Sequence, residues 1–162
     1  MTDPHVLGPD LLPTPFTAEE IRKGCPAGRL TRVRVETTDG SPHERVNRFV
    51  DCDGEGATIE RSSVGADGEP IGAPQLARTT WAGFQSHAAF PRARTTVAHD
   101  VIETPLGRLD CLRYTVLDGS VTDTFWFATS LPGMPVRMVT ENDGRLVETS
   151  TMIADELHST SP

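Results

Sequence analysis

Residues Val97 to Ile153 carry the clearest structural signal of the chain, in the sequence VAHDVIETPLGRLDCLRYTVLDGSVTDTFWFATSLPGMPVRMVTENDGRLVETSTMI. Apolar residues recur with the two-residue period of a β-strand in several short runs. The runs are separated by turn sequences, namely Thr104-Pro105-Leu106-Gly107, Asp118-Gly119 and Asn142-Asp143-Gly144. Such residues accept the backbone conformations that tight hairpin turns require. The pattern therefore predicts consecutive antiparallel strands near residues 97–103, 109–117, 121–128, 136–141 and 146–153.

Several of these strands are apolar on both sides. Phe125 and Phe127 point to one side of a strand, whereas Trp126 between them points to the other. A sheet with one face in water alternates more cleanly between apolar and polar residues. We therefore expect a helix, a ligand or a partner chain to cover the second face, at least in part.

The N-terminal half begins with a Pro-rich segment. Four prolines within residues 1–16 exclude a helix or a central strand and favour an extended arm. Thr17 and Glu20 have the spacing of a capping box, which predicts a short helix from Thr17 to Cys25. Thr80 is a plausible N-cap for a second helix that ends near Ala89. Further strands are expected near residues 31–37, 46–52 and 57–64, with a weak one near 75–78.

These elements predict one α+β domain. We expect a strongly curved antiparallel sheet of about seven or eight strands, a half-barrel, with two short helices on its concave face. The arm would occupy residues 1–16, the curved-sheet domain residues 17–154, and a polar tail residues 155–162.

The C-terminal third resembles a known family through its turns. The residues that carry the likeness are Thr104-Pro105-Leu106-Gly107, Cys111 with Tyr114, Trp126, and Leu131-Pro132-Gly133-Met134-Pro135-Val136. The run resembles half-barrel proteins of the lipoprotein-carrier (LolA/LolB-like) type, and also small actinobacterial proteins of unknown function. The resemblance implies a bent antiparallel sheet around short helices, whose concave face holds acyl chains in the carriers. This sequence differs from exported carriers because no lipid-attachment cysteine lies near its start.

Composition excludes several partners. The 162 residues carry a formal net charge of −8, which disfavours binding to nucleic acid or to an anionic membrane surface. No apolar run approaches the ~20 residues of a membrane-spanning helix, so we expect no membrane insertion. The N-terminus lacks the features of a secretory signal, and we expect a cytoplasmic protein. Its cysteines, Cys25, Cys52 and Cys111, are expected to be reduced and buried.

No motif indicates catalysis or a cofactor. The sequence contains no Gly-x-Ser-x-Gly elbow and no Cys-x-x-Cys or His-x-His pair. His99 and Asp100 are adjacent in a strand and point to opposite faces, so they cannot act as one acid–base pair. His43 lies in a polar turn near Ser41. We therefore expect no catalytic residues, no metal and no cofactor.

The aromatic residues are the remaining candidates for a site. Either they form the core or they line a cavity between the helix at residues 80–89 and the sheet, and the sequence does not separate the two. The cavity would make the protein a non-enzymatic binding domain for an apolar or lipid-like small molecule. The alternative is a protein–protein interaction module without a ligand, for example a homodimer; an enzyme is the least supported reading. The candidate ligand-binding residues are Trp81, Phe84, Tyr114, Phe125, Trp126, Phe127 and Met138.

Overall fold

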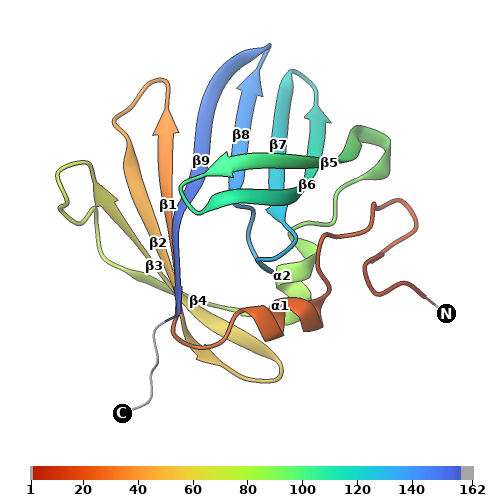
Figure 1. Cartoon of the computed structure of the whole chain (residues 1–162), viewed down its shortest axis with the longest axis horizontal. Helices are drawn as coiled ribbons and strands as arrows, with labels where there is room; N and C mark the ends of the chain where they lie inside the picture. Colours follow the sequence, from red (N-terminus) through yellow and green to blue (C-terminus); the bar gives the residue numbers. More distant parts are fainter. Residues whose placement is uncertain (1, 158–162) are drawn as a thin grey trace.

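The computed structural model describes residues 2–157, which form one antiparallel sheet and two short helices (Figure 1). The helices are α1 (Ala18–Gly24) and α2 (Trp81–Ser86), and a single 3-10 turn, η1, covers Arg92–Arg94. The strands are β1 (Arg29–Thr37), β2 (His43–Cys52), β3 (Gly56–Gly65), β4 (Gln75–Thr80), β5 (Thr95–Thr104), β6 (Gly107–Asp118), β7 (Val121–Ala128), β8 (Arg137–Asn142) and β9 (Arg145–Leu157). No helix in this described part is long and apolar enough to span a membrane.

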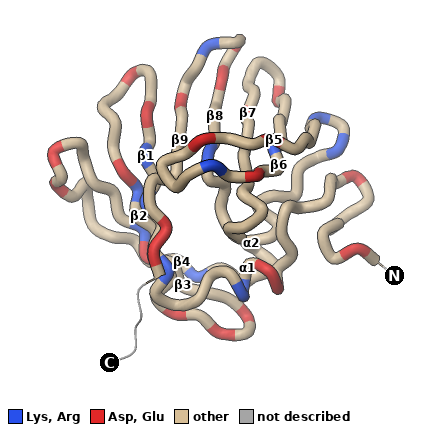
Figure 2. The backbone as a smooth tube through the Cα atoms, viewed as in Figure 1, with Lys and Arg blue, Asp and Glu red and all other residues tan. Residues whose placement is uncertain are grey.

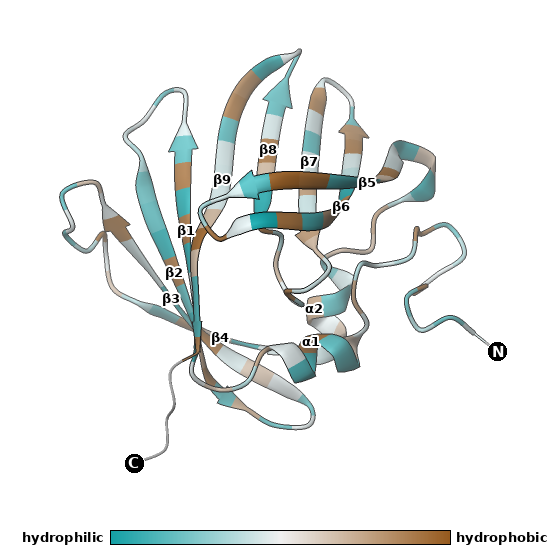
Figure 3. Ribbon diagram, in the orientation of Figure 1, coloured by the Kyte–Doolittle hydropathy of each residue, from teal (hydrophilic) through white to brown (hydrophobic). Residues whose placement is uncertain are grey.

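The sheet consists of two antiparallel meanders that meet at β1 and β9. Its strand order is β4-β3-β2-β1-β9-β8-β7-β6-β5. The chain passes from β4, at one edge, through α2 and η1 to β5, at the other edge. Figure 3 shows apolar and polar segments alternating along many of the strands, as the sequence predicted.

The sheet bends strongly at the end that holds β5. Three strands separate β5 from β9, and a flat sheet would place them about 19 Å apart. Instead β5 contacts β9, and in Figure 1 β5 and the first part of β6 cross in front of β7, β8 and β9. The side of β5 that carries Ala98, Asp100 and Ile102 is partly buried, whereas Val97 and Val101 on its other side are exposed.

The two helices pack on one face of the sheet, which we call the helix side and which carries Phe49, Ala57, Tyr114 and Phe127. Trp81 of α2 is buried there, and its indole Nε1 donates to the carbonyl oxygen of Asp53 at 2.7 Å. The opposite face, which we call the arginine side, carries Arg34, Arg113, Trp126 and Arg137.

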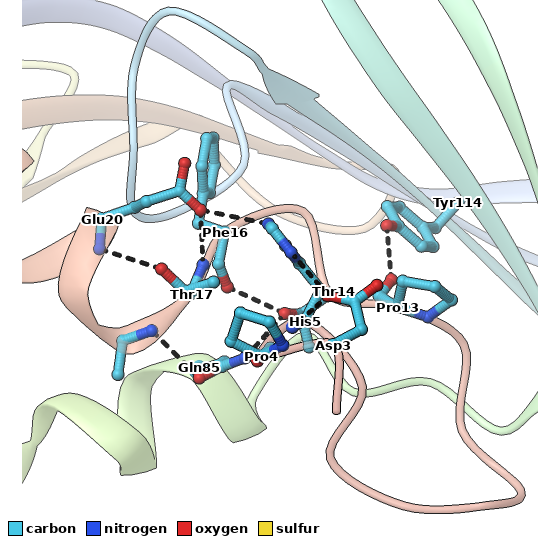
Figure 4. A network of polar contacts seen from close by, with 11 residues as sticks. Asp3, Pro4, His5, Pro13, Thr14, Phe16, Thr17, Glu20, Gln85 and Tyr114 are labelled. Carbon is cyan, nitrogen blue, oxygen red and sulfur yellow. Dashed lines mark hydrogen bonds and ion pairs between the residues drawn. The ribbon is translucent and has the colours of Figure 1, made fainter. Parts of the chain in front are cut away.

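The N-terminal arm is fastened to the helix side by polar contacts (Figure 4). Buried Gln85 of α2 donates to the carbonyl oxygen of Pro4 at 2.8 Å and to Thr14 Oγ1 at 3.0 Å, and it accepts from the amide of Ala18 at 3.0 Å. Tyr114 donates its hydroxyl to the carbonyl oxygen of Pro13 at 2.8 Å. These contacts join the arm to α2 and β6, which lie far from it in the sequence. They hold the arm over the apolar core as a fixed part of the domain.

The local signals for the helices are confirmed, while the strand count is corrected. Thr17 and Glu20 form the capping box at α1, and Thr80 caps α2. The described residues hold nine strands, rather than seven or eight. The weak strand expected near residues 75–78 is β4, which pairs with β3 and has mostly exposed side chains. Residues 155–157, expected in the polar tail, belong to β9; residues 158–162 lie outside the described residues.

Arg29 joins three segments at the base of the sheet. Its guanidinium donates to both carboxylate oxygens of Asp155 on β9, at 3.0 and 3.1 Å. It also donates to the carbonyl oxygens of Gly24, at the end of α1, and Pro132, at 3.0 and 2.6 Å. Gly24 and Pro132 approach so closely that a Cβ on Gly24 would lie 2.8 Å from the Pro132 side chain. Arg29 is 6% exposed, so these contacts are made largely out of water.

Replacing Arg29 should therefore destabilise the domain strongly. Arg29→Gln leaves Asp155 and two carbonyl groups without their charged donor, and breaking a buried ion pair typically costs about 3–5 kcal/mol. Urea unfolding followed by circular dichroism measures the change in the free energy of unfolding. Arg22→Gln, which removes the exposed pair with Glu19, is the matched control and should change it little. A free energy of unfolding that is nearly unchanged in Arg29→Gln would contradict the stabilising role of Arg29.

Candidate functional site

The structure brings most of the expected ligand-binding residues together on the helix side. Trp81 and Phe84 lie 5.6 Å apart between ring centroids, and Tyr114 and Phe127 lie 5.7 Å apart. Phe90, which was not among the expected residues, packs its ring 5.2 Å from that of Tyr114 on β6 and 4.9 Å from that of Phe125 on β7. These rings pack against one another and form the main apolar cluster.

Met138 and Trp126 occupy different positions from that cluster. Met138 pairs with Phe125 across β7 and β8 and is partly buried. Trp126 points to the arginine side and packs in a second cluster with Cys111 and Ala128, so the structure does not bring it to Trp81. The two tryptophans of the chain therefore lie on opposite faces of the sheet.

Trp126 lies among charged groups on the arginine side. Its indole Nε1 donates to Asp100 Oδ2 at 2.9 Å, and Arg113 Nη1 donates to the same oxygen at 3.1 Å. The guanidinium carbon of Arg137 lies 5.4 Å from the centre of the Trp126 ring, which is a cation–π distance. The hydrogen bond from Trp126, followed by the charge of Arg113, lowers the pKa of Asp100.

A groove lies on the same face, across β1, β2 and β3. Its volume is about 550 Å³. The walls combine charged side chains with small or apolar ones, namely Arg32, Arg34, Glu36, Pro42, His43, Glu44, Val64, Gly65, Ala66 and Gly68. Arg32 pairs with Glu44 at 3.0 Å, whereas the side chain of Arg34 has no hydrogen-bond or ion-pair partner within residues 2–157. Figure 2 shows basic and acidic segments interspersed along these strands.

The strand register connects the groove with Trp126. Trp126 pairs with Arg137, Arg137 with Thr151, and Thr151 with Arg34. Arg34 in turn pairs with Glu44, and Glu44 with Val64. Directly paired residues share a face, so one continuous row of side chains crosses the arginine side from Trp126 to the groove.

Of the residues on this face, only Trp126 was among the ligand-binding residues expected from the sequence. Residues alternate along β1, so Arg32, Arg34 and Glu36 point away from Val33 and Val35, which are buried on the helix side. The sequence contained no signal that Arg137, more than one hundred residues later, lies on the same face as Arg34. That position depends on the pairing of β1 with β9 and of β9 with β8.

The cysteines and histidines do not form a catalytic centre. Burial raises the pKa of Cys111 to about 11 and raises the pKa of Cys25, so both remain protonated thiols at neutral pH. His99 is exposed on the outer side of β5, away from Asp100, whereas His43 lines the groove. Among residues 2–157, no group of His, Cys, Asp and Glu side chains could hold a metal ion.

A second hollow, of about 270 Å³, lies beside Arg29 and Asp155. Its charged groups already bind each other, and its remaining walls are mainly Gly24, Pro26, Leu131 and Pro132. It is therefore a weaker candidate for a site than the groove.

Two comparisons with known proteins identified no relative of this chain. No family model matches the chain, and no curated protein matches it. The resemblance to lipoprotein carriers thus rests on the turn motifs of the sequence and stays a prediction.

The contact between Asp100 and Trp126 predicts a pH-dependent signal. A carboxylate whose pKa is lowered on folding stabilises the fold above its unfolded-state pKa and loses that contribution as the pH falls through its folded-state pKa. In a Trp81→Phe background, Trp126 is the sole tryptophan, and its fluorescence should change only below the ordinary aspartate range. Asp100→Asn should remove this transition. A transition that persists in Asp100→Asn would show that another group causes it.

Proposed function

We propose that the chain is a non-enzymatic binding domain for a small amphiphilic molecule, held in the groove across β1, β2 and β3. The observation that carries the proposal is the groove itself. Its volume of about 550 Å³ falls within the ~300–1,000 Å³ typical of small-molecule sites. Charged Arg34 and apolar Val64 both line it, which suits a molecule with a polar and an apolar part.

We also propose that the sheet has the half-barrel shape expected from the sequence. Contact between β5 and β9 supports a sheet that wraps partly around its arginine side. The likeness to carriers of acyl chains is compatible with an amphiphilic ligand, although fold likeness alone does not transfer function. An apolar ligand between α2 and the sheet stays a prediction; the close ring packing of Phe90, Phe125 and Tyr114 favours the groove instead. The cytoplasmic location also stays a prediction.

Native mass spectrometry of the purified protein tests the groove. We expect a bound molecule, recovered by solvent extraction, that is lost in Val64→Arg because the longer side chain fills the groove. Val97→Arg is the matched control: it places the same charge on an exposed valine of β5, outside the groove, and should retain the molecule. A protein with no bound molecule that also binds no added amphiphile, or a molecule retained equally by both variants, would refute the proposal.

An interaction module is the second candidate, and β5 favours it. This ten-residue edge strand exposes Val97 and Val101, and within the described residues it pairs only with β6. Exposed, apolar edge strands are available for pairing with another chain.

If β5 binds a second copy, the mass measured by light scattering should rise with concentration. Val101→Lys should suppress the rise, because a charge on an edge strand opposes pairing. Val147→Lys, on an exposed valine of β9, is the control. A monomeric mass throughout the micromolar range would argue against self-association.

A further inference from the structure

We infer that Arg137, Thr151 and Arg34 form an oxyanion-binding row on the arginine side, which binds the carboxylate or phosphate group of the ligand. This inference rests on the proposed function, because it names the chemical class of the molecule in the groove. It concerns a part of the face that no sequence motif marks.

The register places the three side chains next to one another. Thr151 of β9 pairs with Arg137 of β8 on one side and with Arg34 of β1 on the other. Side chains of directly paired residues have Cβ atoms about 4.5–5.5 Å apart. The Cβ atom of Thr151 is therefore flanked by those of two arginines, and all three side chains carry hydrogen-bond donors for one acceptor group.

Arg137 is positioned by an aromatic ring instead of a carboxylate. Its guanidinium lies over Trp126, and its Nε is buried with no hydrogen-bond partner in residues 2–157. A guanidinium held in this way loses little further freedom when it binds an anion, and its planar donors match carboxylate and phosphate oxygens. Trp126 in turn donates its indole N–H to Asp100, and this hydrogen bond fixes the ring that supports Arg137.

Two of the acidic groups nearby are engaged with other arginines. Glu44 pairs with Arg32, and Asp100 pairs with Arg113, both within 3.1 Å. Glu36 lines the same groove, two residues from Arg34 on the same face of β1, and forms no ion pair within residues 2–157. Arg34, although Glu44 lies opposite it in the register, and Arg137 form no ion pair in the described part of the chain. The guanidinium groups of Arg34 and Arg137 thus keep hydrogen-bond donors available for an anionic ligand.

The groove determines where the rest of the ligand lies. Arg34 belongs both to the row and to the groove wall, so a ligand bound through its acidic group can extend toward Val64. A carboxylate at the end of an apolar chain and a phosphate group share this chemistry. The experiment therefore compares decanoate, uncharged decanol of the same chain length, and inorganic phosphate.

The reporter is the fluorescence of Trp126 in the Trp81→Phe protein, titrated with each probe. We expect decanoate to bind with a dissociation constant that rises about tenfold or more in Arg34→Gln, because a charge-assisted hydrogen bond is lost. Arg137→Gln should have a similar effect, measured by calorimetry because this change also alters the surroundings of Trp126. Arg61→Gln removes an equal charge from an exposed position on the helix side and should leave binding unchanged.

The three probes distinguish a phosphate ligand, a carboxylate ligand and binding that does not depend on the row. Saturable phosphate binding that becomes weaker in Arg34→Gln would support the row and indicate a phosphate ligand. Binding of decanoate, but not of decanol or phosphate, would support the row and indicate a carboxylate ligand. Equal binding of decanoate and decanol, unchanged in Arg34→Gln, would overturn the row but leave the groove as a site. If no probe binds and native mass spectrometry finds no ligand, the row and the proposed function both fail. Arg34 is exposed, so its variant should fold even if Arg137→Gln does not.

Discussion

The pairing of β1 with β9 is the constraint on which the rest of the structure depends. It alone joins the meander of β1 to β4 with the meander of β5 to β9 in the strand order. The pairs extend from Arg29 and Leu157 to Thr37 and Glu148, with a register shift between Arg32 and Val33. Closing a loop of more than one hundred residues has an entropic cost. The buried contacts along the paired strands β1 and β9, which we call the seam, must offset this cost. The ion pair of Arg29 with Asp155 stands at one end of the seam.

The same seam determines which side chains share a face. A slip of one residue between β1 and β9 would turn Val33 and Val35 away from the core and bring Arg34 into it. In the observed register these valines are buried and Arg34 lies next to Thr151. The constraint that buries the core is therefore also the one that assembles the row of Arg34, Thr151 and Arg137. Structure and candidate site depend on one register.

The two faces of the sheet have different roles. On the helix side, α1, α2 and the arm cover a cluster of aromatic rings, and Gln85 and Tyr114 fasten the arm through backbone carbonyl groups. On the arginine side, charged residues surround a partly exposed tryptophan and a groove. Trp81 and Trp126 illustrate the difference, since both donate an indole N–H, one to a backbone carbonyl oxygen and the other to a carboxylate.

By itself, the sequence determined the local features of this protein. The Thr17 and Glu20 capping box, the turn at Asp143 and Gly144, where both φ angles are positive, and the alternation in β1 and β6 depend on neighbouring residues and could be predicted. The pairing of β4 with β3, the extension of β9 to Leu157 and the separation of Trp126 from Trp81 could not. They depend on backbone pairing and on the bend of the sheet between segments far apart in the chain, and the position of Arg137 beside Thr151 and Arg34 depends on three strands at once. Only the tertiary structure decided these features, because pairing energy between distant strands leaves no periodic signal in either strand alone.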